Sequence, residues 1–175
     1  MDIFVQIIGL VLIIICAVSF FFKKKEQFLI CLIIYNLLVF LQYVLQQQLT
    51  ESIITIIGVI REITFFVYEK KDKKPKLLIL VLFEIMFVLI GVVTYQNLYS
   101  LPVIFSSMLS TFAQWQSNMF VLRVVYSVCS ILVIINYAFT GLYTSIIAEA
   151  ISLISSISSI FKYHILKSNI KTSAN

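Results

Sequence analysis

The sequence predicts an all-α membrane protein with about seven transmembrane helices, arranged as two three-helix bundles joined by a linker helix. Three observations lead to this prediction. The 175 residues are 61% hydrophobic and only 12% charged, whereas a soluble domain is about half apolar and a quarter charged. The apolar residues fall into runs of the roughly 20 residues that a helix needs to cross a bilayer. The lysines gather in the short segments between these runs.

Seven segments have the length and composition of spanning helices. They are 3–22, 28–47, 50–68, 77–95, 100–116, 120–138 and 143–163. The third, fifth and seventh contain enough polar residues to be missed by a strict hydropathy threshold, and they depend on the charge pattern of the loops for support.

The first span, 3–22, is expected to remain in the protein rather than to be cleaved. Asp2 precedes the apolar run, and Lys23, Lys24 and Lys25 follow it. A signal peptide carries its positive charge first and a small-residue cleavage site afterwards.

The following spans differ in how they carry polar groups. The second has Gln42 and Gln46 near its end, and the third has Arg61 well inside it. The fourth is the most uniformly apolar after the first, with Glu84 in its interior. In the sixth, Arg123 lies near the predicted cytoplasmic end, where a long side chain can reach the interface.

The loops predict the orientation of the chain. Loop 23–27 has three lysines and loop 69–76 has five, while Lys162, Lys167 and Lys171 lie at or beyond the end of the last span. The loops near 46–50, 96–100 and 140–142 contain no Lys or Arg. With seven spans every basic segment falls on one side, which the positive-inside rule makes cytoplasmic. We therefore expect an outside N-terminus and a cytoplasmic C-terminus.

A shift of 94 residues indicates a weak internal repeat. It superimposes Leu41-Gln42-Tyr43 on Ile135-Asn136-Tyr137, and Thr50 on Thr144. It also places the second span on the sixth and the third on the seventh, so that the fourth is left as a linker. Because the linker crosses the membrane once, both halves would have the same orientation.

This pattern divides the chain. Residues 1–163 form a single transmembrane domain, composed of repeat one (1–68), the linker helix (77–95) and repeat two (100–163). Residues 164–175 form a short basic cytoplasmic tail.

Polar stripes on four spans predict a shared interior. In the seventh span the stripe is Ser145, Glu149, Ser152, Ser156 and Ser159; in the third it is Glu51, Thr55, Gly58 and Glu62. Gln42 with Gln46, and Asn136 with Thr140, occupy matching positions in the second and sixth spans. Steps of three and four place such residues on one helix face, and lipid cannot satisfy polar groups. For the serines alone, close helix packing is the better explanation.

The intramembrane charges favour a function. Arg61, Glu149 and Glu84 lie inside their spans and Glu62 is intermediate, and burying such groups costs at least a few kcal/mol each. Because a guanidinium stays charged, we expect Arg61 to face the interior near Glu84 or Glu149.

Other classes of site find no support in the sequence. Cys16, Cys31 and Cys129 are far apart and form no Cys-x-x-Cys pair, which argues against a disulfide framework or a zinc site. No phosphate-binding loop, His-Glu-x-x-His motif or nucleophile elbow is present, and the single histidine is His164. We expect neither an enzyme nor a cofactor nor a metal. The net charge of +5 follows from the basic loops, so no nucleic-acid partner is expected.

Several stretches resemble one known family. Leu101-Pro102-Val103-Ile104, Ser110-Thr111-Phe112-Ala113 and Arg123 resemble the YgjV family of bacterial inner-membrane proteins, as do Gly58-Val59-Ile60-Arg61 and, in the last two helices, Asn136, Gly141 and Glu149. The resemblance implies topology and an inner-membrane location more than a function. More distantly, the two triplets and linker resemble the SWEET and PQ-loop transporters, although Pro102 has no counterpart in the first span.

The leading interpretation is a small-solute transporter, or a transporter-like protein, in the lipid bilayer. Its path would be lined by Arg61, Glu149, Glu62, Glu84, Gln42, Asn136, Thr55, Ser145, Ser152 and Ser156. Arg61 would hold an anionic group or a counter-carboxylate, and Glu149 a cation or proton. The alternative is a non-transporting assembly or regulatory protein whose charges only pair with each other. A small polar solute is the expected partner, and association with further copies is left open.

Overall fold

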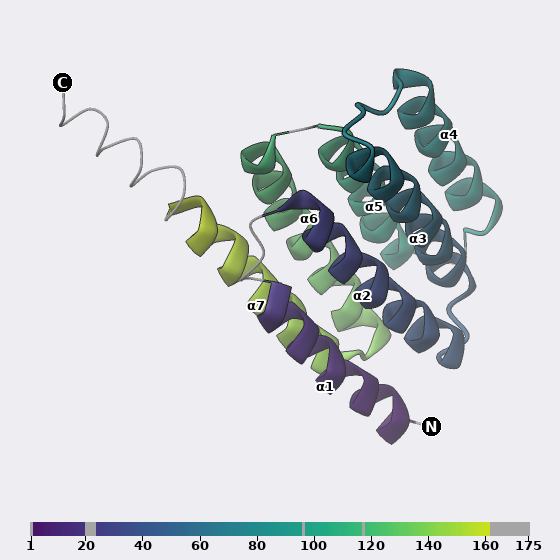
Figure 1. Ribbon diagram of the computed structural model, residues 1–175. Coiled ribbons are helices and arrows are strands. Elements are labelled where there is room, and N and C mark those ends of the chain that lie inside the picture. Colours follow the sequence, from purple (N-terminus) through teal and green to yellow (C-terminus); the bar gives the residue numbers. More distant parts are fainter. Residues whose placement is uncertain (1, 20–23, 96, 117, 162–175) are drawn as a thin grey trace.

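The computed structural model describes residues 2–19, 24–95, 97–116 and 118–161. These residues form seven α-helices, one short 3₁₀-helix and no strand. The elements are α1 (Asp2–Ser19), α2 (Lys25–Leu45), α3 (Leu49–Lys70), α4 (Leu77–Val93), η1 (Leu98–Ser100), α5 (Leu101–Trp115), α6 (Met119–Thr140) and α7 (Tyr143–Ile160). The predicted all-α fold is confirmed (Figure 1). Each helix begins and ends within about three residues of the predicted span.

Local sequence accounts for where several helices begin and end. Pro102 lies in the first turn of α5, where its missing N–H would have no partner within the helix. The Asn118 side chain caps α6 by accepting a 2.9 Å hydrogen bond from the Phe120 amide. Gly141 ends α6 with a φ of 75°, a conformation that glycine adopts without steric cost. The short loops that result place successive helices side by side in opposite directions.

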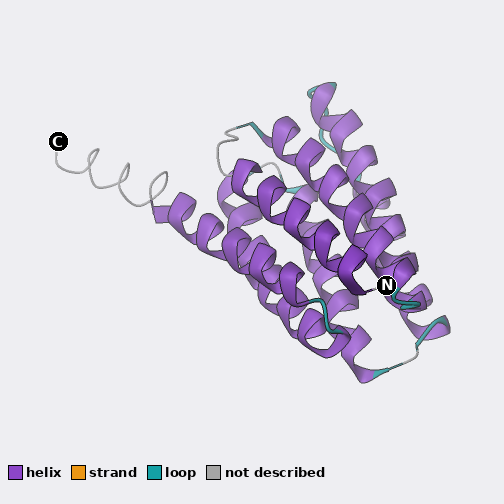
Figure 2. Ribbon diagram, turned by 90° about the horizontal axis from the view of Figure 1, so that it is seen from below, coloured by secondary structure: helices purple, strands orange, loops and turns teal. Residues whose placement is uncertain are grey.

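Six helices form a closed ring, and α4 lies outside it. Around the ring α1 packs on α2, α2 on α3, α3 on α5, α5 on α6, α6 on α7, and α7 on α1. The linker helix α4 packs against α3 and α5, at the outer edge of the bundle (Figures 1 and 2). In this order α2 faces α6 across the ring, and α3 faces α7. The three helices that precede α4 and the three that follow it therefore form a single ring.

The outer surface is apolar. Each of the seven helices exposes large hydrophobic side chains, among them Val92 and Val93 of α4 and Phe139 of α6. Soluble monomers rarely expose apolar patches of more than a few hundred Å², so this surface suits contact with lipid. Among the described residues two helices, α2 and α6, are long and apolar enough to cross a membrane by length and composition alone. Shorter apolar helical segments are Ile3–Cys16 of α1, the whole of α4, and Tyr143–Ser158 of α7.

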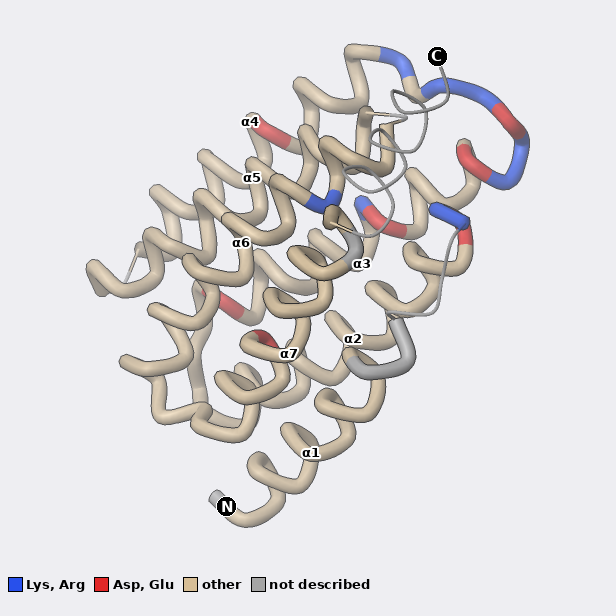
Figure 3. The backbone as a smooth tube through the Cα atoms, turned by 90° about the vertical axis from the view of Figure 1, so that its left-hand side faces the viewer, with Lys and Arg blue, Asp and Glu red and all other residues tan. Residues whose placement is uncertain are grey.

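The described lysines gather at one end of the bundle. Figure 3 shows them at the start of α2, at the end of α3, and in the loop that leads to α4, whereas the two arginines lie within α3 and α6. We call this the lysine-bearing end, defined by Lys24, Lys25 and the lysines of 70–76. Lys23 and the predicted cationic residues of the C-terminal tail lie outside the described residues.

Candidate functional site

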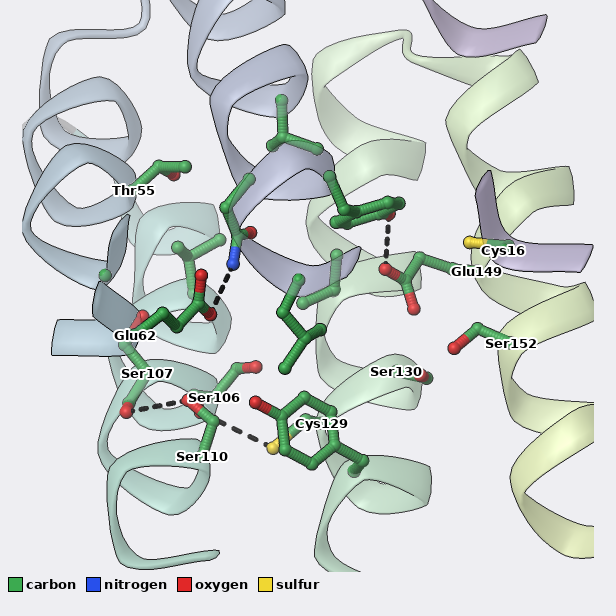
Figure 4. A pocket seen from close by; sticks show the side chains of 18 of the residues that line it. Cys16, Thr55, Glu62, Ser106, Ser107, Ser110, Cys129, Ser130, Glu149 and Ser152 are labelled. Atoms are coloured by element: carbon green, nitrogen blue, oxygen red, sulfur yellow. Dashed lines mark hydrogen bonds between the residues drawn. The ribbon is translucent and has the colours of Figure 1, made fainter. Parts of the chain in front are cut away.

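A cavity of about 120 Å³ lies inside the ring, lined by side chains from all six ring helices. A buried water needs roughly 10–15 Å³ on this scale, so the cavity has room for several waters or a small solute. Its wall is mixed, because aliphatic residues alternate with hydroxyl, amide and carboxyl groups (Figure 4).

Two aromatic pairs join α2 to α6 across the ring. Near the lysine-bearing end, Phe28 and Tyr126 meet edge to face, with ring centroids 5.5 Å apart. Near the opposite end, Tyr43 and Tyr137 have centroids 6.1 Å apart. All four residues line the cavity. The two pairs are separated by roughly 16 to 22 Å along the helices, at 1.5 Å per residue, and the cavity lies between them.

A buried amide reinforces the lysine-free end. Gln42 on α2 donates a 2.9 Å hydrogen bond to the carbonyl of Val5 on α1, and its own oxygen accepts one of 3.0 Å from Ser145 on α7. The hydroxyl of Tyr43 donates to Asn136 at 2.8 Å. These bonds tie together the ends of four ring helices.

A second amide makes the corresponding contacts in the other half. Asn136 on α6 donates 2.8 Å to the carbonyl of Tyr99 and 3.4 Å to the Glu51 carboxylate. Asn136, Tyr99 and Ser145 stand 94 residues after Gln42, Val5 and Glu51 respectively. Gln42, Asn136 and Ser145, which the sequence assigned to the path, do not line the cavity. They hold the bundle together beyond its end.

At the lysine-bearing end a buried cation joins three helices. Lys25 of α2 lies 3.1 Å from the carboxylate of Glu69 at the end of α3. It also donates a 3.1 Å hydrogen bond to the carbonyl of Gln116, which follows α5. This contact fastens α2 to the junction between the two halves.

Arg61 of α3 is buried, with 3% of its surface exposed, and lines the cavity. Its head group points to α5, where Nη1 donates to the Ser107 carbonyl at 2.8 Å, to Ser110 at 2.7 Å and to Thr111 at 3.0 Å. Nη2 lies 3.2 Å from Glu62. The salt-bridge partner of Arg61 is therefore its sequence neighbour Glu62, and not Glu84 or Glu149. Glu84 on α4 is nevertheless close enough to interact electrostatically with Arg61.

Glu62 is fully buried and uses its two oxygens differently. Oε1 accepts hydrogen bonds from Asn36 at 2.6 Å, Arg61 at 3.2 Å and Gln114 at 3.4 Å. Oε2 has no hydrogen-bond partner among the described residues. A buried carboxylate oxygen without a hydrogen-bond donor is costly. A donor or a positive charge supplied by a ligand at Oε2 would therefore be stabilising.

Glu149 of α7 enters the cavity from the wall opposite Glu62 (Figure 4). Only 8% of it is exposed, and its Oε1 accepts a 2.5 Å hydrogen bond from the Tyr35 hydroxyl. In the described part of the chain no Lys or Arg forms a salt bridge with it. Ser152 and Ser156 line the cavity on the same helix, as Thr55 does on α3. The side chain of Ser159 lies outside the described residues.

The structure differs from the predicted path in two further respects. Glu84 lies on α4 outside the ring and does not line the cavity. The sequence reading missed the lining aromatic residues, as well as Asn36 and the three cysteines. Tyr35, Val39 and Tyr43 recur at intervals of four in the sequence. This spacing places them on one helix face and could have indicated that they line the interior. The described residues contain no group of three His, Cys, Asp or Glu able to hold a metal ion.

Comparison with known proteins supplies a family. The family model Imp-YgjV, described as a bacterial inner membrane protein, matches residues 3–167. No curated protein and no solved structure matches the chain. The resemblance to the YgjV family is thus confirmed, while the likeness to SWEET and PQ-loop transporters stays a prediction.

Proposed function

This chain belongs to the Imp-YgjV family of bacterial inner membrane proteins, and from that premise we propose that it carries a small polar solute across the membrane through its central cavity. The observation that carries the proposal is a cavity that contains charged and polar side chains and has an aromatic pair toward each end. The bilayer is its environment, and the substrate binds between the two pairs.

The energetics of the cavity support a ligand-binding role. Glu149 is buried with the hydroxyls of Tyr35 and Ser130 as hydrogen-bond partners but without a salt bridge in the described residues, and one oxygen of Glu62 has no donor among them. Uncompensated polar groups in a membrane interior are costly, and mark ion or substrate paths. A bundle that served only as an assembly partner would be more stable with these positions filled by apolar side chains.

The proposed mechanism is alternating opening of the two ends. Opening of the Tyr43–Tyr137 pair would connect the cavity to one side, and opening of the Phe28–Tyr126 pair would connect it to the other. The interfaces of α3 with α5 and of α7 with α1 join the two halves, so rocking of the halves would occur there. Arg61 of α3 holds α5 across one of these interfaces, which supports a role as counter-charge to Glu62 rather than as an anion site.

The predicted internal repeat fits this mechanism. The Gln42–Val5 and Asn136–Tyr99 hydrogen bonds are related by a shift of 94 in both donor and acceptor. This correspondence supports two halves of the same orientation, as in parallel-repeat transporters. We further propose that all seven helices cross the membrane, with the lysine-bearing end in the cytoplasm and the N-terminus outside.

The test is whether the cavity can be reached from both sides. Cys129 lines the cavity, so a variant with Cys16→Ser and Cys31→Ser leaves it as the only thiol. We expect a membrane-impermeant thiol reagent to modify Cys129 in both right-side-out and inside-out vesicles. A matched control carries Ile131→Cys and Cys129→Ser instead, since Ile131 is 50% exposed on the outer surface near the middle of α6 and should not react.

Two results would contradict the proposal. Reaction of Cys129 only after denaturation would indicate a dry bundle and favour the assembly or regulatory protein. Reaction from one side alone would indicate a vestibule without alternating access.

A further inference from the structure

Resting on the proposed function, we propose that the solute is a small organic cation of the ammonium type. The cavity is lined by three charged side chains in the described residues, Arg61, Glu62 and Glu149. One positive and two negative formal charges leave an excess negative charge in a cavity inside the ring of helices. Electrostatic attraction is strongest where the effective dielectric constant is low, so a cation is the favoured occupant.

The arginine that lines the cavity, Arg61, is not available to an anion. Nη1 of Arg61 donates to three acceptors on α5, and Nη2 pairs with Glu62. The guanidinium carbon lies 5.6 Å from the centre of the Phe87 ring of α4. Only Nε lacks a partner, whereas arginine sites for carboxylate or phosphate present two parallel N–H groups. An anion placed there would also meet the carboxylates of Glu62 and Glu149.

The two carboxylates are arranged to receive positive charge from opposite walls. Glu62 on α3 presents a buried oxygen without a donor among the described residues. Glu149 on α7, which α3 faces across the ring, is held by Tyr35 and not by a cation of the described chain. Figure 4 shows both side chains directed into the cavity from opposite sides. A cation between them would offset the negative charge that the protein leaves uncompensated.

The aromatic wall specifies an organic cation. Five aromatic residues line the cavity: Phe28, Tyr35, Tyr43, Tyr126 and Tyr137. Cations are attracted to aromatic faces, and cages of such rings recognise ammonium groups. A divalent metal ion needs several oxygen or nitrogen ligands at once, and the described residues provide no such group. Aliphatic side chains such as Val39 and Val133 complete a wall that suits a partly apolar solute.

The experiment compares three probes of similar size and shape that differ in charge. Tetramethylammonium is the cation, tert-butanol the neutral analogue and trimethylacetate the anion. Each is added to vesicles with Cys129 as the only thiol, and the rate of Cys129 modification is measured with one neutral thiol reagent. We expect tetramethylammonium to slow the reaction at least fivefold at saturation, and the other two to change it less than twofold.

Variants locate the binding site. Glu149→Gln keeps an oxygen that can accept from Tyr35 but removes the charge, and should raise the half-protecting concentration at least about tenfold. Glu84→Gln removes an intramembrane carboxyl that lies outside the ring, and should leave protection unchanged. The comparison of the three probes on the parent variant stands even if Glu149→Gln does not fold.

The possible failures are distinguishable. If Cys129 reacts from both sides but trimethylacetate or tert-butanol protects as well as tetramethylammonium, or no probe protects, the cation inference is overturned while the transport proposal stands. If Cys129 does not react in the native protein at all, both fall.

Discussion

Arg61 and Glu62 are consecutive on α3, yet they form a buried ion pair of 3.2 Å. Consecutive helical residues point in directions about 100° apart and do not usually face each other. The pair forms because the long arginine side chain turns toward α5, where hydroxyl and carbonyl groups fix its head group. The sequence therefore predicts that Arg61 needs an acidic partner but not which acid it is. Residues that interact along one helix are usually three or four positions apart, so an adjacent residue is not an expected partner.

The pairing can be tested through stability. Arg61→Ala leaves Glu62 buried without its cation, and breaking a buried pair costs about 3–5 kcal/mol. We expect a clear fall in the thermal unfolding temperature of purified protein. Arg61→Ala with Glu62→Gln should recover part of the loss, because no carboxylate is then left without its counter-charge.

The matched control exchanges the acid. Arg61→Ala with Glu84→Gln should recover less, because Glu84 forms no salt bridge with Arg61. Arg61→Lys should be a poor substitute because an ammonium cannot reproduce the spread of guanidinium contacts. Recovery with Glu84→Gln equal to that with Glu62→Gln would show that the pair assigned here is not the one that matters.

At the scale of helices, hydrophobicity and loop charge suffice to predict each element, but not the order of contacts. Every span of roughly 20 apolar residues became a helix, since a helix satisfies its own backbone in a membrane. The polar stripes predicted which faces of α3 and α7 point inward, and Thr55, Glu62, Glu149, Ser152 and Ser156 do line the cavity. Gln42 and Asn136 lie just beyond it, because depth along a helix depends on helix tilt and contact partners.

The contact between α1 and α7 depends on the absence of a side chain at Gly9. A Cβ atom there would lie 1.9 Å from the hydroxyl oxygen and 2.6 Å from the Cβ of Thr144. Gly9→Ala should therefore separate the two helices and lower stability by about 1–3 kcal/mol, the usual cost of overpacking. Gly58→Ala is the control, since its nearest neighbour would be 3.9 Å away. Equal thermal unfolding temperatures for the two variants would contradict the close α1–α7 packing.

For the whole molecule, the ring explains how two weakly similar halves can share one site. The shift of 94 pairs α2 with α6 and α3 with α7, and these are the helices that face each other across the cavity. The sequence predicted that four polar faces meet, but it did not predict the aromatic pairs. A tyrosine in a membrane helix is usually attributed to the interface, and only the ring brings Tyr43 and Tyr137 together.

Flux of a permanently charged probe tests the central claim most directly. Tetramethylammonium cannot lose a proton and cross the bilayer as a neutral molecule, so its exchange into liposomes requires a protein path. We predict that liposomes containing the purified protein exchange isotope-labelled tetramethylammonium faster than protein-free liposomes. The exchange should fall at least about tenfold with Glu149→Gln and should persist with Glu84→Gln. Cooperative thermal unfolding would show that the purified protein is folded. If such protein gave exchange no faster than protein-free liposomes, the result would contradict a cation path through the cavity.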